Sequence, residues 1–158
     1  MECWWPRPWG LTFAATRAGA TCNGQPIAVA RLDTLDVIRL PVEPAFASFW
    51  SAPWRVEPVH RPNSQALRMA LVASGEAHGM VDGRATHEWD VAAASLIVEA
   101  AGGRVTDREG VPFRFNKPRP QVAGIVAATP ALHEPLARRL ADLRAALHRA
   151  GVALERDG

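Results

Sequence analysis

The sequence has few cysteines: Cys3 and Cys22 are the only two among its 158 residues. Two cysteines provide neither a disulfide framework nor metal-type spacing, and their scarcity fits a reducing cytoplasm. An excess of charge is lacking too, because 18 basic residues are scattered along the chain and the formal net charge is only +2. This pattern excludes the dense basic stripe with which proteins bind a nucleic-acid polymer.

Long hydrophobic runs are also absent. No apolar stretch approaches the roughly 18 residues that a membrane-spanning helix needs. The first ten residues lack the basic n-region and the continuous apolar h-region of a signal peptide. We therefore expect a cytoplasmic protein that does not act in a membrane.

Two common ligand-binding motifs are missing as well. His60, His78 and His87 do not have zinc-type spacing such as His-Glu-x-x-His. No glycine-rich nucleotide loop is present, since the pair Gly102-Gly103 is explained by the end of a helix. These absences argue against a zinc site and against a dinucleotide-binding domain.

What the sequence does contain is enough chain for one domain with a hydrophobic core. Residues 1–10 form an atypical opening rich in tryptophan and proline, residues 11–150 a single domain, and residues 151–158 a tail. The opening is an aromatic anchor for a partner, a strand cut short, or the product of a start site outside the ancestral reading frame.

The expected elements alternate between strand and helix. Strands are expected at residues 11–16, 36–40, 76–82, 104–106 and 124–128, with a turn, a short strand and a hairpin turn over 17–24. Residues 42–63 contain four prolines and are expected to form a loop-rich connection with little regular structure. Such alternation predicts a layered α/β domain.

Three helices are expected, at residues 64–74, 90–101 and 130–150. Ser64 is the expected N-cap of the first helix, in which Leu67, Leu71 and Val72 share one face. Asp90 is expected to cap the second helix, with Leu96, Ile97 and Ala100 or Ala101 forming its buried stripe. In the third helix leucines recur at positions 132, 136, 140, 143 and 147.

Asp90 is also the main candidate for chemistry. A carboxylate at the start of a helix is often only a cap, worth about 1 kcal/mol. It can equally be a magnesium ligand, since Mg²⁺ prefers carboxylate oxygens completed by water and substrate phosphate. Asp82, Arg84 and Glu88 add charges of both signs nearby, and Ser64 opens a helix whose free N–H groups could receive an anion. Each of these has a plain alternative: a surface ion pair for Arg84 and Glu88, and a cap for Ser64.

Four stretches in this order resemble the C-terminal half of the inositol monophosphatase superfamily. They are Ser-Gln-Ala-Leu-Arg-Met-Ala-Leu-Val-Ala-Ser-Gly (64–75), His-Glu-Trp-Asp-Val-Ala-Ala-Ala (87–94), Glu-Ala-Ala-Gly-Gly-Arg-Val-Thr-Asp (99–107) and Gly-Ile-Val-Ala-Ala-Thr-Pro-Ala-Leu-His (124–133). Residues 17–27 are similar to the family's Gly-Ala-x-x-Asn-Gly-x-x-Ile hairpin. The resemblance implies a layered α/β sandwich of the sugar-phosphatase type and a magnesium-dependent phosphomonoester hydrolase.

The resemblance also implies roles for single residues. The aspartate of the Trp-Asp motif, here Asp90, is a metal ligand in this family. Asp82 falls near the acidic residue that binds a substrate hydroxyl, and Ser64 matches a residue that approaches substrate, although Asn63 replaces the glycine before it. Glu88-Trp89-Asp90, with Arg84 and Thr86 ahead of it, looks most like the 3′(2′),5′-bisphosphate nucleotidase branch. Arg84 would then make a charge-assisted contact with a phosphate of a small phosphorylated metabolite.

The sequence departs from the family in lacking a Gly-Glu-Glu segment and an Asp-Pro-x-Asp-Gly-Thr segment, which carry the other metal ligands. The chain begins roughly where the family leaves the second motif, and we expect a truncated protein with weak Mg²⁺ binding, little or no turnover and unknown water-activating residues. A hydrophobic sheet edge left open would favour either self-association into homo-oligomers or instability. Two alternatives stay open: a catalytically inactive fragment or interaction module, and a phosphatase acting on inositol or histidinol phosphate.

Overall fold

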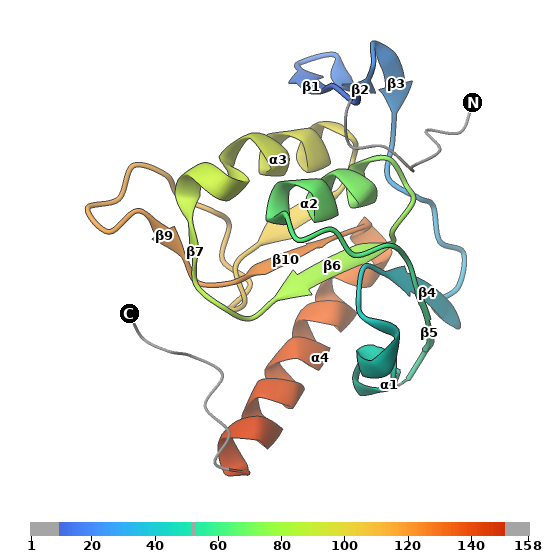
Figure 1. The fold of residues 1–158 in the computed structure, drawn as a ribbon, viewed down its shortest axis with the longest axis vertical. Coiled ribbons are helices and arrows are strands. Elements are labelled where there is room, and N and C mark those ends of the chain that lie inside the picture. The colour runs from blue at the N-terminus through green and yellow to red at the C-terminus, as the bar shows by residue number, and fades with distance from the viewer. Residues whose placement is uncertain (1–9, 52, 151–158) are drawn as a thin grey trace.

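The structure, a computed structural model, describes residues 10–51 and 53–150. The predictions for Cys3, for tryptophans 4, 5 and 9 and for the tail at 151–158 fall outside these residues. The described chain is arranged in four layers of alternating sheet and helix (Figure 1). The predicted layered α/β architecture is therefore confirmed.

The outermost layer is an antiparallel sheet in the order β1-β2-β3. It comprises β1 (Phe13–Thr16), β2 (Gly19–Cys22) and β3 (Gln25–Ile27). The predicted hairpin turn is present, with Asn23 and Gly24 both at positive φ (50° and 77°) between β2 and β3. The inner face of this sheet contacts α3 and buries Ala20 and Cys22.

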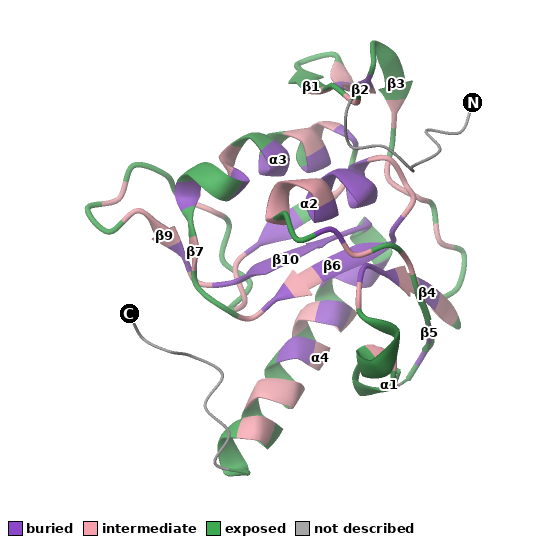
Figure 2. Ribbon diagram, in the orientation of Figure 1, coloured by how far each residue is buried: buried purple, intermediate pink, exposed green. Residues whose placement is uncertain are grey.

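The central layer is an antiparallel sheet in the order β6-β10-β8. Its strands are β6 (Gly79–Asp82), β8 (Arg104–Thr106) and β10 (Ile125–Ala128). All four residues of β10 are buried because helices cover both faces of this middle strand (Figure 2). A fully apolar strand is the expected result of such burial.

Helices α2 (Gln65–Ala73) and α3 (Glu88–Ala100) pack together on one face of the central sheet. The twenty-residue α4 (Pro130–Arg149) lies against the other face. Its first three leucines, Leu132, Leu136 and Leu140, are buried, while Leu143 and Leu147 are only half-buried where α4 extends beyond the sheet. Gly79 permits the close approach of α4, since a Cβ there would lie 2.7 Å from Leu136 Cδ2.

Two expectations for the helices were wrong. Helix α3 begins at Glu88, its N-cap is His87, and Asp90 is its third residue rather than its cap. Leu96 is 59% exposed, and α3 instead buries Val91, Ala94 and Val98 against α2 and the sheet. Small side chains on that face allow the close contact between α2 and α3.

The proline-rich connection is more regular than predicted. It contains a 3₁₀ turn, η1 (Pro44–Phe46), a short helix, α1 (Ala47–Trp50), and the strand β5 (Arg55–Pro58). Strand β5 pairs in parallel with β4 (Val37–Leu40). The expectation of little regular structure was wrong because Val56 and Trp54 enter a second core with Ile38, Leu40 and the start of α4.

Two further strands, β7 (Thr86–His87) and β9 (Gln121–Val122), were not predicted. They pair antiparallel, with Thr86 opposite Val122 and His87 opposite Gln121. The pairing joins the residues just before α3 to a segment some 35 residues later in the sequence. A two-residue strand carries no periodicity by which the sequence could reveal it.

Candidate active site

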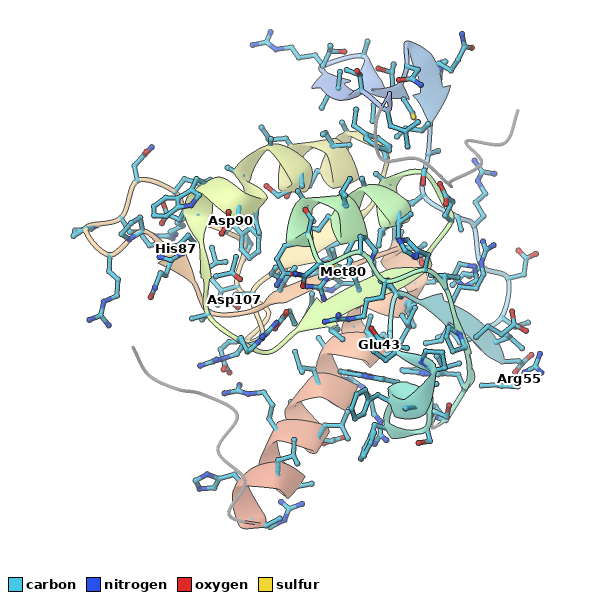
Figure 3. The ribbon with its side chains drawn as sticks, in the orientation of Figure 1. Glu43, Arg55, Met80, His87, Asp90 and Asp107 are labelled. Atoms are coloured by element: carbon cyan, nitrogen blue, oxygen red, sulfur yellow. The ribbon has the colours of Figure 1, made fainter. Side chains whose placement is uncertain are left out.

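The predicted site residues lie on two adjoining segments. Asp82 is the last residue of β6 and Arg84 lies in the turn that follows it, while Asp90 lies in the first turn of α3. Strand β7 connects the turn to the helix, so the end of β6 lies on the same side of the molecule as the start of α3 (Figure 1). Figure 3 shows Asp90 at that start.

Asp82 is the centre of a hydrogen-bonded network. Its Oδ1 accepts from the backbone N–H of Arg84 at 3.0 Å and from Arg84 Nε at 3.2 Å. Its Oδ2 accepts from Gln65 Nε2 at 2.7 Å and from Arg84 Nη2 at 3.1 Å. A buried guanidinium, that of Arg68, also reaches Oδ2 with Nη2 at 3.5 Å. Both oxygens of the carboxylate are therefore occupied by donors from the protein itself.

The ionised state of Asp82 is favoured by this network. Burial raises the pKa of the carboxyl group, but hydrogen bonds from Arg84 and Gln65 outweigh that effect and lower the pKa to about 2. Backbone shape supports the arrangement: Gly124, at a φ of +82°, lies so close that a Cβ would be 2.7 Å from the Asp82 carbonyl oxygen. Asp82 thus anchors the turn and orients Arg84, whose side chain is 67% exposed.

Ser64 is the N-cap of α2, as predicted, and its Oγ accepts from the N–H of Leu67 at 3.3 Å. Its neighbour Gln65 is the residue that donates to Asp82. Ser64 therefore directly precedes, in sequence, the residue that binds Asp82. Ser64 is exposed, and its hydroxyl is already engaged as the cap of α2.

Asp90 has a different environment from Asp82. It is exposed, and within residues 10–51 and 53–150 no hydrogen bond or ion pair joins it to Asp82, Ser64 or Arg84. Its backbone lies in the first helical turn, where N–H groups are not used inside the helix and the helix dipole favours an anion. The Asp90 carboxylate is open to an incoming ligand.

Glu88, the first residue of α3, was expected to form part of an exposed charged cluster or a surface pair with Arg84. It is instead only 6% exposed. Its Oε2 accepts from the N–H of Asn116 at 2.7 Å, and Lys117 Nζ lies 3.4 Å from its Oε1. Glu88 therefore fastens the 116–117 loop to the start of α3, and the idea of a surface pair with Arg84 was wrong.

The turn after β6 is contacted by residues that were not predicted from the sequence. Arg108 Nη1 donates to the carbonyl of Gly83 at 2.8 Å, and Arg144 Nη1 lies 3.1 Å from Glu109 Oε1. Gln65 and Arg68 were missed as well, but Arg68 offered a signal, because it is a charged residue within the apolar run of a predicted helix. No comparable signal marked Arg108 or Arg144, which approach from distant parts of the chain.

The described residues can supply part of a magnesium site. No three His, Cys, Asp or Glu side chains within the two described ranges gather closely enough to enclose a metal ion. Magnesium is commonly held by one or two carboxylates, with water and substrate phosphate completing six ligands. Asp90 fits one such carboxylate position, whereas Asp82 does not have a free oxygen.

Comparison with known proteins identifies the fold. The sequence model of the inositol monophosphatase family matches residues 10–145. A phosphatase from Arabidopsis thaliana, named IMPL1 and chloroplastic, is 32% identical over 95% of this chain and 41% of its own length. The inositol-1-monophosphatase of Synechocystis sp. is 30% identical over 83% of this chain and 47% of its own length.

A solved structure agrees. The inositol monophosphatase from Anabaena superposes with a TM-score of 0.66 at 28% identity, over 84% of this chain and 54% of its own. This chain thus spans about half the length of the relatives that it matches. No helix among its described residues combines the length and apolar character needed to cross a bilayer. On the match over residues 10–145, the chain belongs to the inositol monophosphatase family.

Proposed function

We propose that this chain forms part of a magnesium-dependent phosphomonoester hydrolase that acts on a small phosphorylated metabolite. The observation that carries the proposal is the open carboxylate of Asp90, which lies in the first turn of a 13-residue helix in a chain of this family. A cation at Asp90 would supply positive charge to a phosphate and lower the pKa of a bound water.

The other proposed roles belong to the turn after β6 and to the start of α2. Arg84 contacts a substrate phosphate, since its guanidinium is exposed while Asp82 fixes its orientation. Ser64 and Asp82 position sugar or phosphate groups beside it. Of these three residues the geometry favours Arg84, because the Asp82 oxygens and the Ser64 hydroxyl already have partners in the protein.

For the substrate we propose a 3′(2′),5′-bisphosphate nucleotide such as adenosine 3′,5′-bisphosphate. The Glu88-Trp89-Asp90 sequence, with Arg84 and Thr86 ahead of it, supports this branch of the family. A second candidate is an inositol phosphate, which is favoured by the name of the Synechocystis relative. The proposal places the protein in the cytoplasm, with self-association into a homo-oligomer as a further expectation.

The 158 residues contain neither of the family's two other metal-ligand segments, and Asp90 is one carboxylate. Stabilising both the entering and the leaving oxygen of a phosphoester needs more positive charge than one such ligand can hold in place. We therefore expect weak magnesium binding and slow or absent turnover by these residues alone. A catalytically inactive interaction module is the alternative that this expectation leaves open.

The test is release of inorganic phosphate from adenosine 3′,5′-bisphosphate and from inositol 1-phosphate in the presence of magnesium. The purified chain is compared with Asp90→Asn and with a control variant, Asp142→Asn, which removes an exposed carboxylate on α4. The proposal expects Asp90→Asn to abolish whatever release is measured and Asp142→Asn to leave it unchanged. Equal rates in the two variants would refute the role of Asp90, and no release from either ester would favour the inactive module.

A further inference from the structure

An aromatic pair without a role in the proposed chemistry stands directly beside Asp90. The ring of His87 stacks on that of Trp89, with ring centroids 4.3 Å apart and planes inclined by 11°. Trp89 is nevertheless 66% exposed, the highest exposure among the large exposed apolar side chains of the described residues. One face of the indole is covered by the imidazole, so the exposed area lies mainly on the opposite face and the ring edges.

The backbone that carries the two rings is held firmly in place. His87 belongs to β7 and pairs with Gln121 of β9, and the N–H of Glu88 donates to the carbonyl of Pro120 at 2.9 Å. Glu88 lies between the two aromatic residues, and its buried carboxylate accepts from the N–H of Asn116. The backbone that carries the two rings is therefore held in place before any ligand arrives, which reduces the entropy that binding would cost.

The location of the stack relates it to the proposed phosphate position. Trp89 and Asp90 are consecutive residues in the first turn of α3, where side chains tilt toward the helix N-terminus. His87 and Asp90 lie at this same end of the helix in Figure 3. If the phosphate of a ligand binds near Asp90, the remaining part of that ligand can reach the indole ring of Trp89.

We propose that the His87–Trp89 stack is a subsite for a planar heteroaromatic ring, the base of a nucleotide substrate. The inference rests on the proposed function for its phosphate position and adds a determinant of substrate class. Bases stack on aromatic side chains through their π-faces with little preference among sequences, and each such contact strengthens binding substantially. A sugar phosphate or an inositol phosphate has no ring of this kind and would gain nothing from the stack.

The competing occupant of Trp89 is a second copy of the chain. Trp89, Ala93 and Leu96 lie along one exposed stripe of α3, and such a stripe could join two molecules. A flat base is favoured because the indole is already stacked on His87, a polar residue outside the stripe. A stacked pair of rings offers a flat surface to a base, whereas a dimer contact would need only an apolar side chain. Leu96→Ala, on the same helix and also exposed, therefore serves as the matched control.

The experiment measures equilibrium binding of adenosine 3′,5′-bisphosphate, ribose 5-phosphate and adenosine by calorimetry with magnesium present. We expect Trp89→Ala to weaken binding of the two adenine-containing probes by roughly tenfold or more. Trp89→Phe should keep most of the affinity, and His87→Ala should lose part of it. Ribose 5-phosphate should bind equally well to all variants, and Leu96→Ala should bind every probe as the unmodified chain does. Circular dichroism checks that each variant is folded.

Several outcomes would overturn the inference. One is an equal loss of affinity for adenosine 3′,5′-bisphosphate and ribose 5-phosphate in Trp89→Ala. Another is a change of oligomeric state, measured by light scattering, in both Trp89→Ala and Leu96→Ala without any base-dependent loss. Asp90-dependent binding of ribose 5-phosphate with no gain from the adenine ring would refute the subsite and leave the proposed function standing. If binding of adenosine depends on Trp89 while binding of the phosphates does not depend on Asp90, the subsite stands and the proposed function is refuted.

Discussion

Replacing Asp82 by asparagine tests the network on which the geometry of the turn depends. The Asp82 side chain is 7% exposed and faces Arg68, whose side chain is only 4% exposed. Lowering the Asp82 pKa from its ordinary value of 3.8 to about 2 corresponds to about 2 kcal/mol in favour of the ionised, folded state. Asparagine keeps one acceptor oxygen but leaves the buried guanidinium without a countercharge. Loss of one partner of a buried pair costs up to roughly 3–5 kcal/mol.

We therefore expect Asp82→Asn to lower the free energy of unfolding at pH 7 by about 2–3 kcal/mol. The measurement is urea denaturation followed by circular dichroism, with Asp142→Asn as the control. Because the folded-state pKa is depressed, the stabilisation is present above the unfolded pKa and is lost as pH falls through the folded pKa. The pH-linked part of the difference between the unmodified chain and Asp82→Asn should shrink to roughly half by pH 3. A difference that stays constant with pH, or a loss no larger than that of Asp142→Asn, would refute the assignment.

Three further predictions address other parts of the fold. Burial lowers the pKa of His133, so the folded state disfavours its protonation, and stability should fall as pH drops below about 6.5; urea midpoints measured across this range should fall less in His133→Gln. Gly124→Ala should cost about 2 kcal/mol or more, because φ is +82° and the new methyl group would lie 2.7 Å from the Asp82 carbonyl oxygen; a thermal melt that matches the unmodified chain would contradict this. Leu136→Ala should lower the free energy of unfolding, measured by urea denaturation, by about 2–5 kcal/mol, because Leu136 is fully buried. Leu96→Ala should lower it by almost nothing, because Leu96 is 59% exposed. Equal losses of stability in the two variants would show that the buried face of α3 has been misassigned.

The sequence allowed correct prediction of the elements whose signals are local. The leucine spacing of α4, the serine cap of α2 and the apolar strand β10 each follow from residues near one another in the chain. The start of α3 was misplaced by two residues, because it depends on Glu88 binding a loop at 116–117. The exposed Leu96 was misassigned because tight packing against α2 favours small residues, so the most hydrophobic residue is not the most buried.

The candidate site shows the same division between local and long-range information. Asp82, Arg84 and Gln65, the neighbour of Ser64, are joined by hydrogen bonds, and their roles in binding substrate stay predictions. The hydrogen bonds of Asp82 with Gln65 and Arg68 join residues 17 and 14 positions apart, respectively, and no periodicity in the sequence reveals such contacts. The His87–Trp89 stack likewise requires the β7–β9 pairing, which only the folded chain provides.

A calorimetric titration of the purified chain with Mg²⁺ would show whether Asp90 is a magnesium ligand. We expect weak, saturable binding of Mg²⁺ to the unmodified chain and to Asp142→Asn, and no binding to Asp90→Asn. Circular dichroism should show the same fold in all three, since the Asp90 side chain is exposed and makes no hydrogen bond or ion pair within the described residues. Magnesium binding of equal affinity in Asp90→Asn would show that Asp90 is not a magnesium ligand.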